Sequence, residues 1–122
     1  MGRGVDRRQL ESRFQPVSQA LRQCAASCEA ALQEYASRLG LSAEHQLLRE
    51  LIPAIATVRT AADFLHDEER RELVLGLAHD ACRRAAAECR RYGLDDDLLR
   101  CAAACNQAGS EIEPLLTALV HD

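Results

Sequence analysis

The feature that most constrains this chain is the spacing of its apolar residues, which recur every three or four positions in four stretches. Such spacing places them along one side of an α-helix. The stretches run from about residue 15 to 39, from 42 to 66, from 67–69 to 92 and from 95–97 to 119. Short connections join them, and short connections make consecutive helices antiparallel. The sequence therefore predicts an all-α fold, an antiparallel up-down-up-down four-helix bundle.

Local signals support these boundaries. Pro16 suits the first turn of a helix and Gly40 suits a helix end. Ser42 is the predicted N-cap of the second helix, and the acidic residues 67–69 favour a third helix start because they complement the helix dipole. Pro53 lies inside the second stretch and is expected to kink it, because its ring removes one backbone hydrogen bond.

Composition fits a single bundle domain. The chain has 122 residues, of which 48% are hydrophobic and only 3% aromatic; alanine and leucine are strong helix formers and suit closely packed helices. We expect residues 1–14 to form a disordered N-terminal arm and residues 15–122 to form the domain.

The residues on the predicted apolar stripes are Val17, Leu21, Cys24, Cys28, Ala31, Leu32, Tyr35 and Leu39; Leu47, Leu48, Leu51, Ile52, Ile55, Val58, Ala62 and Leu65; Leu73, Leu75, Leu77, Ala78, Cys82, Ala85, Ala86 and Cys89; and Leu98, Leu99, Cys101, Cys105, Ala108, Ile112, Leu115, Leu116 and Leu119.

Charge and hydropathy exclude several classes of protein. The net charge of -4 argues against a nucleic-acid-binding protein, which needs a basic face. No run approaches the roughly 18 apolar residues of a membrane span, and the N-terminus lacks the apolar core of a secretory signal. We therefore expect a cytoplasmic protein without a membrane or nucleic-acid partner. In that reducing compartment its cysteines are expected to be thiols.

The six cysteines are spaced so that each of three pairs lies on one face of a predicted helix. They form pairs four or seven residues apart, and either interval returns a side chain to the same side of a helix. These pairs are Cys24 with Cys28, Cys82 with Cys89, and Cys101 with Cys105. Counting from the predicted helix ends at residues 39–43 and 92–95 puts Cys28, Cys82 and Cys105 at one depth, Cys89 and Cys101 nearer that end, and Cys24 one turn deeper. The sequence thus predicts a column of thiols contributed by the first, third and fourth helices.

Soft thiolate ligands favour Cu(I), zinc or iron–sulfur clusters. Pairs one helical turn apart do not match the short ligand loops of zinc ribbons, whereas Cu(I) accepts two or three sulfur ligands; the pattern therefore favours Cu(I). His79, one turn before Cys82, is a further candidate metal ligand. Two other interpretations stay open: the thiols pack as small hydrophobic groups, or an interhelical pair such as Cys89 and Cys101 forms a disulfide.

Signals for catalysis are weak. A cysteine nucleophile needs an adjacent base, and His79 with Cys82 is the one such pair. A di-iron carboxylate centre needs two Glu-x-x-His motifs, and the nearest match, Asp63 with His66, occurs once. We identify no catalytic residue.

At its cysteine motifs the sequence resembles the copper storage proteins, four-helix bundles that bind Cu(I) with interior thiolates. The resemblance spans about residues 24–112 and rests on the segments CAASCEAA, AADFL, LAHDACRRAAAEC and LLRCAAAC. It implies a homo-oligomer of bundles with Cu(I) bound by all six cysteines. Where family helices usually continue the thiol pattern, this chain has Ala31, Ala85, Ala108 and Ile112, which implies a lower copper capacity.

Three functional hypotheses follow. The first is Cu(I) binding for cytosolic storage, sequestration or transfer. The second is a family relative in which the alanines that replace thiols leave a cavity for a small organic ligand or a pathway-specific reaction. The third is an interaction bundle whose thiols serve only in packing.

Overall fold

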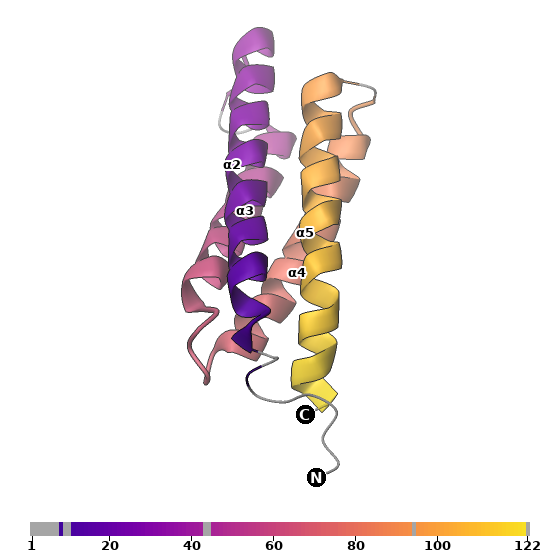
Figure 1. Cartoon of the computed structure of the whole chain (residues 1–122). Helices are drawn as coiled ribbons and strands as arrows, with labels where there is room; N and C mark the ends of the chain where they lie inside the picture. Colours follow the sequence, from indigo (N-terminus) through magenta and orange to yellow (C-terminus); the bar gives the residue numbers. More distant parts are fainter. Residues whose placement is uncertain (1–7, 9–10, 43–44, 94, 122) are drawn as a thin grey trace.

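The computed structural model describes residues 8, 11–42, 45–93 and 95–121. Four helices make up the bundle: α2 (Phe14–Leu39), α3 (Gln46–Phe64), α4 (Arg71–Arg90) and α5 (Asp96–His121). They lie side by side in Figure 1, and the described residues include no strand. The predicted all-α four-helix bundle is confirmed.

Each helix packs against two neighbours, so that α2, α3, α4 and α5 form a closed ring. Interhelical contacts join early residues of one helix to late residues of the next. For example, Arg22 in the first half of α2 pairs with Asp63 near the end of α3 at 2.9 Å, and Arg38 near the end of α2 pairs with Asp97 at the start of α5 at 2.9 Å. The colours of Figure 1 agree, since α2 runs upward in that view and α5 runs downward. The interior of the ring is where side chains from all four helices meet.

Helix starts differ from the sequence prediction in two places. The N-cap of α3 is His45, not Ser42: the Leu47 N–H donates to His45 Nδ1 at 3.1 Å. Likewise α4 begins at Arg71, because the Asp67 carboxylate accepts the N–H groups of Glu69 (3.0 Å) and Arg70 (3.3 Å) in the turn before it. A side chain that satisfies these amides locally delays the first helical turn.

The other helix ends follow the sequence prediction. Asp95 Oδ1 accepts the Asp97 N–H at 2.9 Å at the start of α5. Gly40 ends α2 with a φ of 63°, a left-handed conformation that glycine adopts without a steric penalty.

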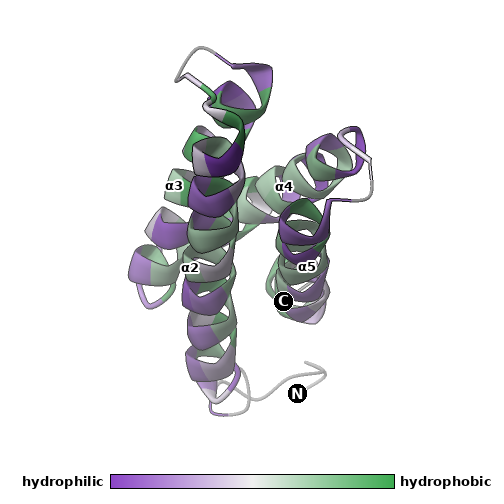
Figure 2. Cartoon of the chain, turned by 90° about the horizontal axis from the view of Figure 1, so that it is seen from above, coloured by the Kyte–Doolittle hydropathy of each residue, from purple (hydrophilic) through white to green (hydrophobic). Residues whose placement is uncertain are grey.

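The core contains most of the predicted stripe residues, but five large ones face solvent. Their exposed fractions are 52% for Leu39, 53% for Ile52, 64% for Leu73, 52% for Leu77 and 39% for Leu99. Each lies at the edge of a stripe that is narrower than predicted, and hydrophilic and hydrophobic residues alternate around each helix in Figure 2. On α4 the core positions are instead Val74 and Ala81.

Phe14 closes one end of the bundle. It was predicted to belong to the N-terminal arm, but it is the first residue of α2 and is 1% exposed. The Arg71 guanidinium lies 4.0 Å from the centre of its ring, and the His66 ring meets it edge-on at 5.8 Å. Arg71 Nε also donates to the Leu65 carbonyl at 2.7 Å. The rest of the predicted arm, apart from residues 8 and 11–13, lies outside the described residues.

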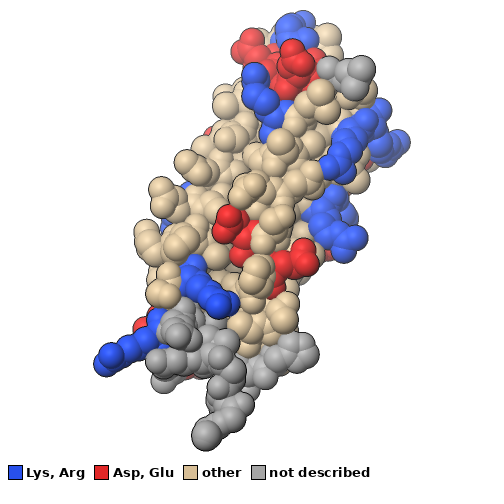
Figure 3. Space-filling model, turned by 45° about the vertical axis from the view of Figure 1, so that its right-hand side comes forward, with Lys and Arg blue, Asp and Glu red and all other residues tan. Residues whose placement is uncertain are grey.

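At the opposite end, charged side chains join α2 to α5. Arg38 donates to the carboxylates of Asp95 and Asp97, each at 2.9 Å. Figure 3 shows acidic and basic groups gathered at that upper end, above a broad face with few charges; residues 101–110 of α5 include none. None of the described helices combines the length and apolar character that a membrane crossing requires.

Candidate metal centre

All six cysteines are free thiols buried in the bundle core. None is more than 4% exposed. They come from α2, α4 and α5, while α3 contains no cysteine. The prediction that these side chains point inward is confirmed.

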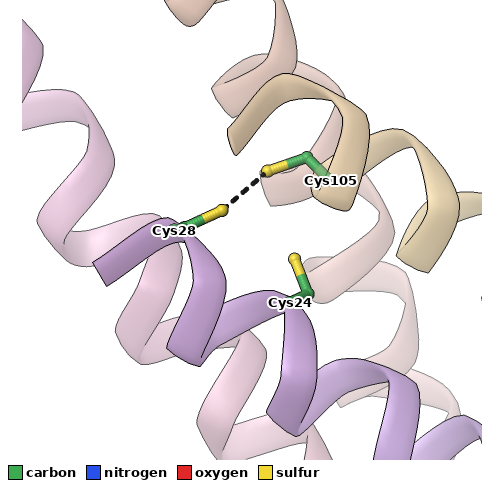
Figure 4. A group of neighbouring side chains, drawn as sticks. All are labelled: Cys24, Cys28 and Cys105. Atoms are coloured by element: carbon green, nitrogen blue, oxygen red, sulfur yellow. Dashed lines mark hydrogen bonds between the residues drawn. The ribbon is translucent and has the colours of Figure 1, made fainter. Parts of the chain in front are cut away.

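Three of these thiols converge on one point. Cys24 and Cys28 lie one turn apart on α2, and Cys105 of α5 faces them, as Figure 4 shows. Their sulfur atoms all lie within 4.8 Å of one another, and Cys28 Sγ is 3.4 Å from Cys105 Sγ. Within the described part of the chain this is the one group of three candidate metal ligands at such short range.

Cys82 lies farther from the end of the bundle formed by residues 39–43 and 92–95 than the sequence predicted. The contact between His79 and Glu113 shows which parts of α4 and α5 lie at the same level, and counting from it places Cys82 about one turn below Cys105. The contact between Cys28 and Cys105 places Cys24 at that same lower level. Counting residues from the helix ends did not account for this displacement of α4 along α5. The close group therefore contains Cys24 and not Cys82.

The remaining cysteines extend the group in both directions. Cys82 lies beside Cys24 at the deeper end, where that neighbour helps to raise the pKa of Cys82, and Cys89 lies beside Cys101 toward the other end, with the same effect on the pKa of Cys89. Cys101 in turn contacts Cys28 and Cys105, and the Cys28 thiol donates to the Cys101 carbonyl at 3.6 Å. The six thiols therefore form a continuous network through the core.

The network divides the thiols by acidity. The neighbouring thiols of Cys105, Cys28 and Cys82 are able to donate to the Cys24 sulfur and lower its pKa; those of Cys105, Cys28 and Cys89 have the same effect on the pKa of Cys101. The pKa values of the other four thiols are raised, because they donate to these two sulfurs and because burial disfavours an anion. Cys24 and Cys101 are thus the sulfurs most easily deprotonated.

The space between the sulfurs is small. A cavity of about 10 Å³ lies among apolar side chains and five of the cysteines, namely Cys24, Cys28, Cys82, Cys101 and Cys105. A volume of this order holds about one water-sized sphere, so it suits a bare ion and not an organic molecule. Ala85 lines this cavity, whereas Ala31 and Ala108 do not. Among the described residues, the cavity between the thiols that Ala85 lines is therefore too small for an organic ligand.

His79 lies apart from the close thiol group. Its side chain is 21% exposed, and its Nε2 is 3.4 Å from a carboxylate oxygen of Glu113. This position does not support the predicted role of His79 as a ligand of the close group, and the variant described below tests that role.

Comparison with known families agrees with the site. A family model described as copper storage protein matches residues 10–117. The chain belongs to the copper storage protein family. Comparisons with curated proteins and with solved structures gave no match. For a copper storage protein, the donor set found here is chemically apt, since buried thiolates in a dry site select soft metal ions.

Proposed function

We propose that this copper storage protein binds Cu(I) through its core thiolates and serves in cytoplasmic copper storage, sequestration or transfer, at lower capacity than typical family members. The observation that carries the proposal is the convergence of the Cys24, Cys28 and Cys105 sulfurs within 4.8 Å in a buried site. Six free thiols are also typical of proteins in a reducing compartment, which supports the cytoplasmic part of the proposal. By family resemblance we infer a homo-oligomer.

The geometry favours Cu(I) over zinc. Structural zinc sites are almost always tetrahedral with four protein ligands, and the close group supplies three. Three sulfurs complete the coordination of Cu(I). Among the described residues that line the cavity, the side chains are cysteine, alanine, leucine, isoleucine and valine, so none of these side chains offers the oxygen or nitrogen ligand that a harder metal would prefer.

The three thiols outside the close group determine how many copper ions each chain is able to bind. Cys82 lies beside one end of the close group, and Cys89 with Cys101 lies beside the other. If each Cu(I) takes two or three sulfurs, six thiolates accommodate about two or three ions with shared ligands. Ala31, Ala85 and Ala108, which are buried along the same helices, add no ligand.

Anaerobic titration of the reduced protein with Cu(I) against a competing chelator tests the proposal. We expect about two or three ions per chain to be held against the chelator. Binding no tighter than that of a simple monothiol would refute it.

Copper affinity is expected to fall as the pH falls. The raised pKa values of Cys28, Cys82, Cys89 and Cys105 keep these thiols protonated in the metal-free protein at neutral pH. Each must lose its proton to bind copper, so metal and protons compete. We expect the apparent association constant to drop about tenfold per pH unit for each proton released. Competition titrations at pH 6, 7 and 8 measure this slope, and a pH-independent constant would contradict thiol ligation.

Replacement of His79 by alanine is expected to leave the number of bound copper ions unchanged, because its Nε2 faces Glu113 at the edge of the bundle. The titration described above, performed on His79→Ala, checks this. Loss of one ion would instead identify His79 as a ligand.

A further inference from the structure

Cys28 and Cys105 bring two sulfur atoms from different helices into contact. Cys28 lies on α2 and Cys105 on α5, and their Sγ atoms are 3.4 Å apart, as the dashed line in Figure 4 marks. A disulfide has an S–S length of about 2.0 Å, so the two sulfurs need to approach one another by only about 1.4 Å. Modest rotations about the two Cα–Cβ bonds cover such a distance.

The thiol pairs that lie on a single helix are less suited to a bridge. Cys24 and Cys28 are one turn apart on α2, and Cys101 and Cys105 are one turn apart on α5. Side chains at this spacing have Cβ atoms about 5–6 Å apart, whereas a disulfide needs a Cβ–Cβ distance of about 3.8 Å. A bridge within the close group is therefore expected across the two helices.

The space beside this interhelical pair limits which oxidant is able to reach it. Both side chains are buried, with Cys28 2% and Cys105 3% exposed. They line the cavity of about 10 Å³ between the thiols, and a volume of this order holds about one water-sized sphere. Hydrogen peroxide is only slightly larger than water, whereas oxidised glutathione is a peptide many times larger. The cavity therefore favours a small peroxide as the oxidant.

We propose that Cys28 and Cys105 form a reversible disulfide when hydrogen peroxide oxidises the metal-free protein. In the first step one sulfur forms an S–O bond and becomes a sulfenic acid, while the O–O bond breaks and one water leaves. In the second step the other sulfur attacks the sulfenic acid, so that an S–S bond forms, the S–O bond breaks and a second water leaves with the thiol proton. The two thiols lose two electrons and two protons, and one peroxide becomes two waters.

The disulfide removes two of the three ligands of the close group. Cys24 is then the one thiol left in that group, and a metal is held by thiolates, which the oxidised sulfurs no longer supply. Reduction by a small thiol breaks the bond and restores both ligands. Oxidation thus lowers the copper capacity of the chain until the bond is reduced. This consequence rests on the proposed copper function, whereas the disulfide itself does not.

Mapping of the bond in the wild-type chain tests the proposal. The reduced, metal-free protein is treated with hydrogen peroxide, and its remaining thiols are alkylated in denaturant. We expect two of the six thiols to be lost. Tryptic digestion without reduction should yield residues 23–38 linked to residues 101–122, with fragment ions that assign the bond to Cys28 and Cys105. Retention of all six thiols under conditions that oxidise N-acetylcysteine, or a bond at another pair such as Cys89 with Cys101, overturns the proposal.

Variants and a second oxidant test the pair and the cavity separately. Cys28→Ser and Cys105→Ser should each abolish the mapped bond, whereas Cys82→Ser should keep it, although Cys82 lines the same cavity. Oxidised glutathione should react with the wild-type chain at least about tenfold more slowly than peroxide does, when each rate is divided by that for N-acetylcysteine, because access limits exchange. Loss of the bond in Cys82→Ser would contradict the assigned pair, and equal relative rates would contradict the assigned oxidant.

Titration of the oxidised chain with Cu(I) against the chelator tests the consequence for copper. We expect at least one tightly held ion fewer than in the reduced chain, and recovery of that ion after reduction with dithiothreitol and its removal. Equal numbers of bound ions in both forms would overturn the link to copper. A mapped disulfide in a chain that binds no copper when reduced would refute the proposed function alone, whereas copper binding without the disulfide would refute this inference alone.

Discussion

Replacing Cys105 with serine is expected to remove at least one tightly bound Cu(I) ion per chain. The Cys105 sulfur lies within 4.8 Å of both Cys24 and Cys28, and it also contacts Cys101. Losing it leaves two sulfurs on one helix without the facing ligand from α5. Outer-shell changes at metal sites cost about 10- to 100-fold in affinity, so loss of a ligand should cost at least about 100-fold. Competition titration with a Cu(I) chelator measures the change.

Two control variants show whether the loss of copper binding is specific to the close thiol group. Ala108 is 1% exposed and lies on α5 one turn after Cys105, so Ala108→Ser adds a hydroxyl to the core while keeping every thiol. It should bind copper like wild type. Cys89→Ser should have a smaller effect than Cys105→Ser, because Cys89 has a single thiol neighbour, Cys101. Wild-type binding by Cys105→Ser, or equal losses in all three variants, would contradict the assignment of the close thiol group.

Replacing Phe14 with alanine is expected to destabilise the bundle by about 3 kcal/mol. The ring is 1% exposed, and truncation of a buried phenylalanine costs about 3–5 kcal/mol. The contacts with Arg71 and His66 are lost as well. For a domain of this size the change corresponds to a decrease in Tm of roughly 10–20 °C. Thermal unfolding followed by circular dichroism measures it.

The control for Phe14 is a large apolar residue that packs less. Leu99→Ala removes a side chain that is 39% exposed, and its effect on Tm should be a fraction of that of Phe14→Ala. Equal decreases, or no decrease for Phe14→Ala, would show that residue 14 belongs to the N-terminal arm and not to the core.

Most of the fold could be predicted from the sequence because helical periodicity is a local property. The period of apolar residues located all four helices, and Gly40 and Asp95 marked two of their ends. The missed helix starts at His45 and Arg71 depend on which side chain satisfies the first free amides, and several residues in each turn are able to do so.

The site was partly predictable for a related reason. Intervals of four and seven residues place cysteines on one face of a helix, and all six proved to be buried. The levels at which cysteines of different helices meet depend on how far each helix is displaced along its neighbour. This displacement depends on how the buried side chains of neighbouring helices pack together, and the spacing of residues along one helix does not determine it. The predicted depths grouped Cys82 with Cys28 and Cys105, whereas the close group in the structure contains Cys24 in its place.

The same limit applies to the exposed leucines. Leu73 and Leu77 match the helical period as well as Val74 and Ala78 do, because a stripe of adjacent residues has no sharp edge in a sequence. Their exposure follows from where α3 packs against α4.

Copper X-ray absorption spectroscopy on the protein loaded anaerobically with one equivalent of Cu(I) tests the central claim most directly. Because the close group consists of Cys24, Cys28 and Cys105 alone, we predict a coordination shell of two or three sulfur atoms with no nitrogen or oxygen. A shell containing nitrogen or oxygen ligands would contradict copper binding by the core thiolates.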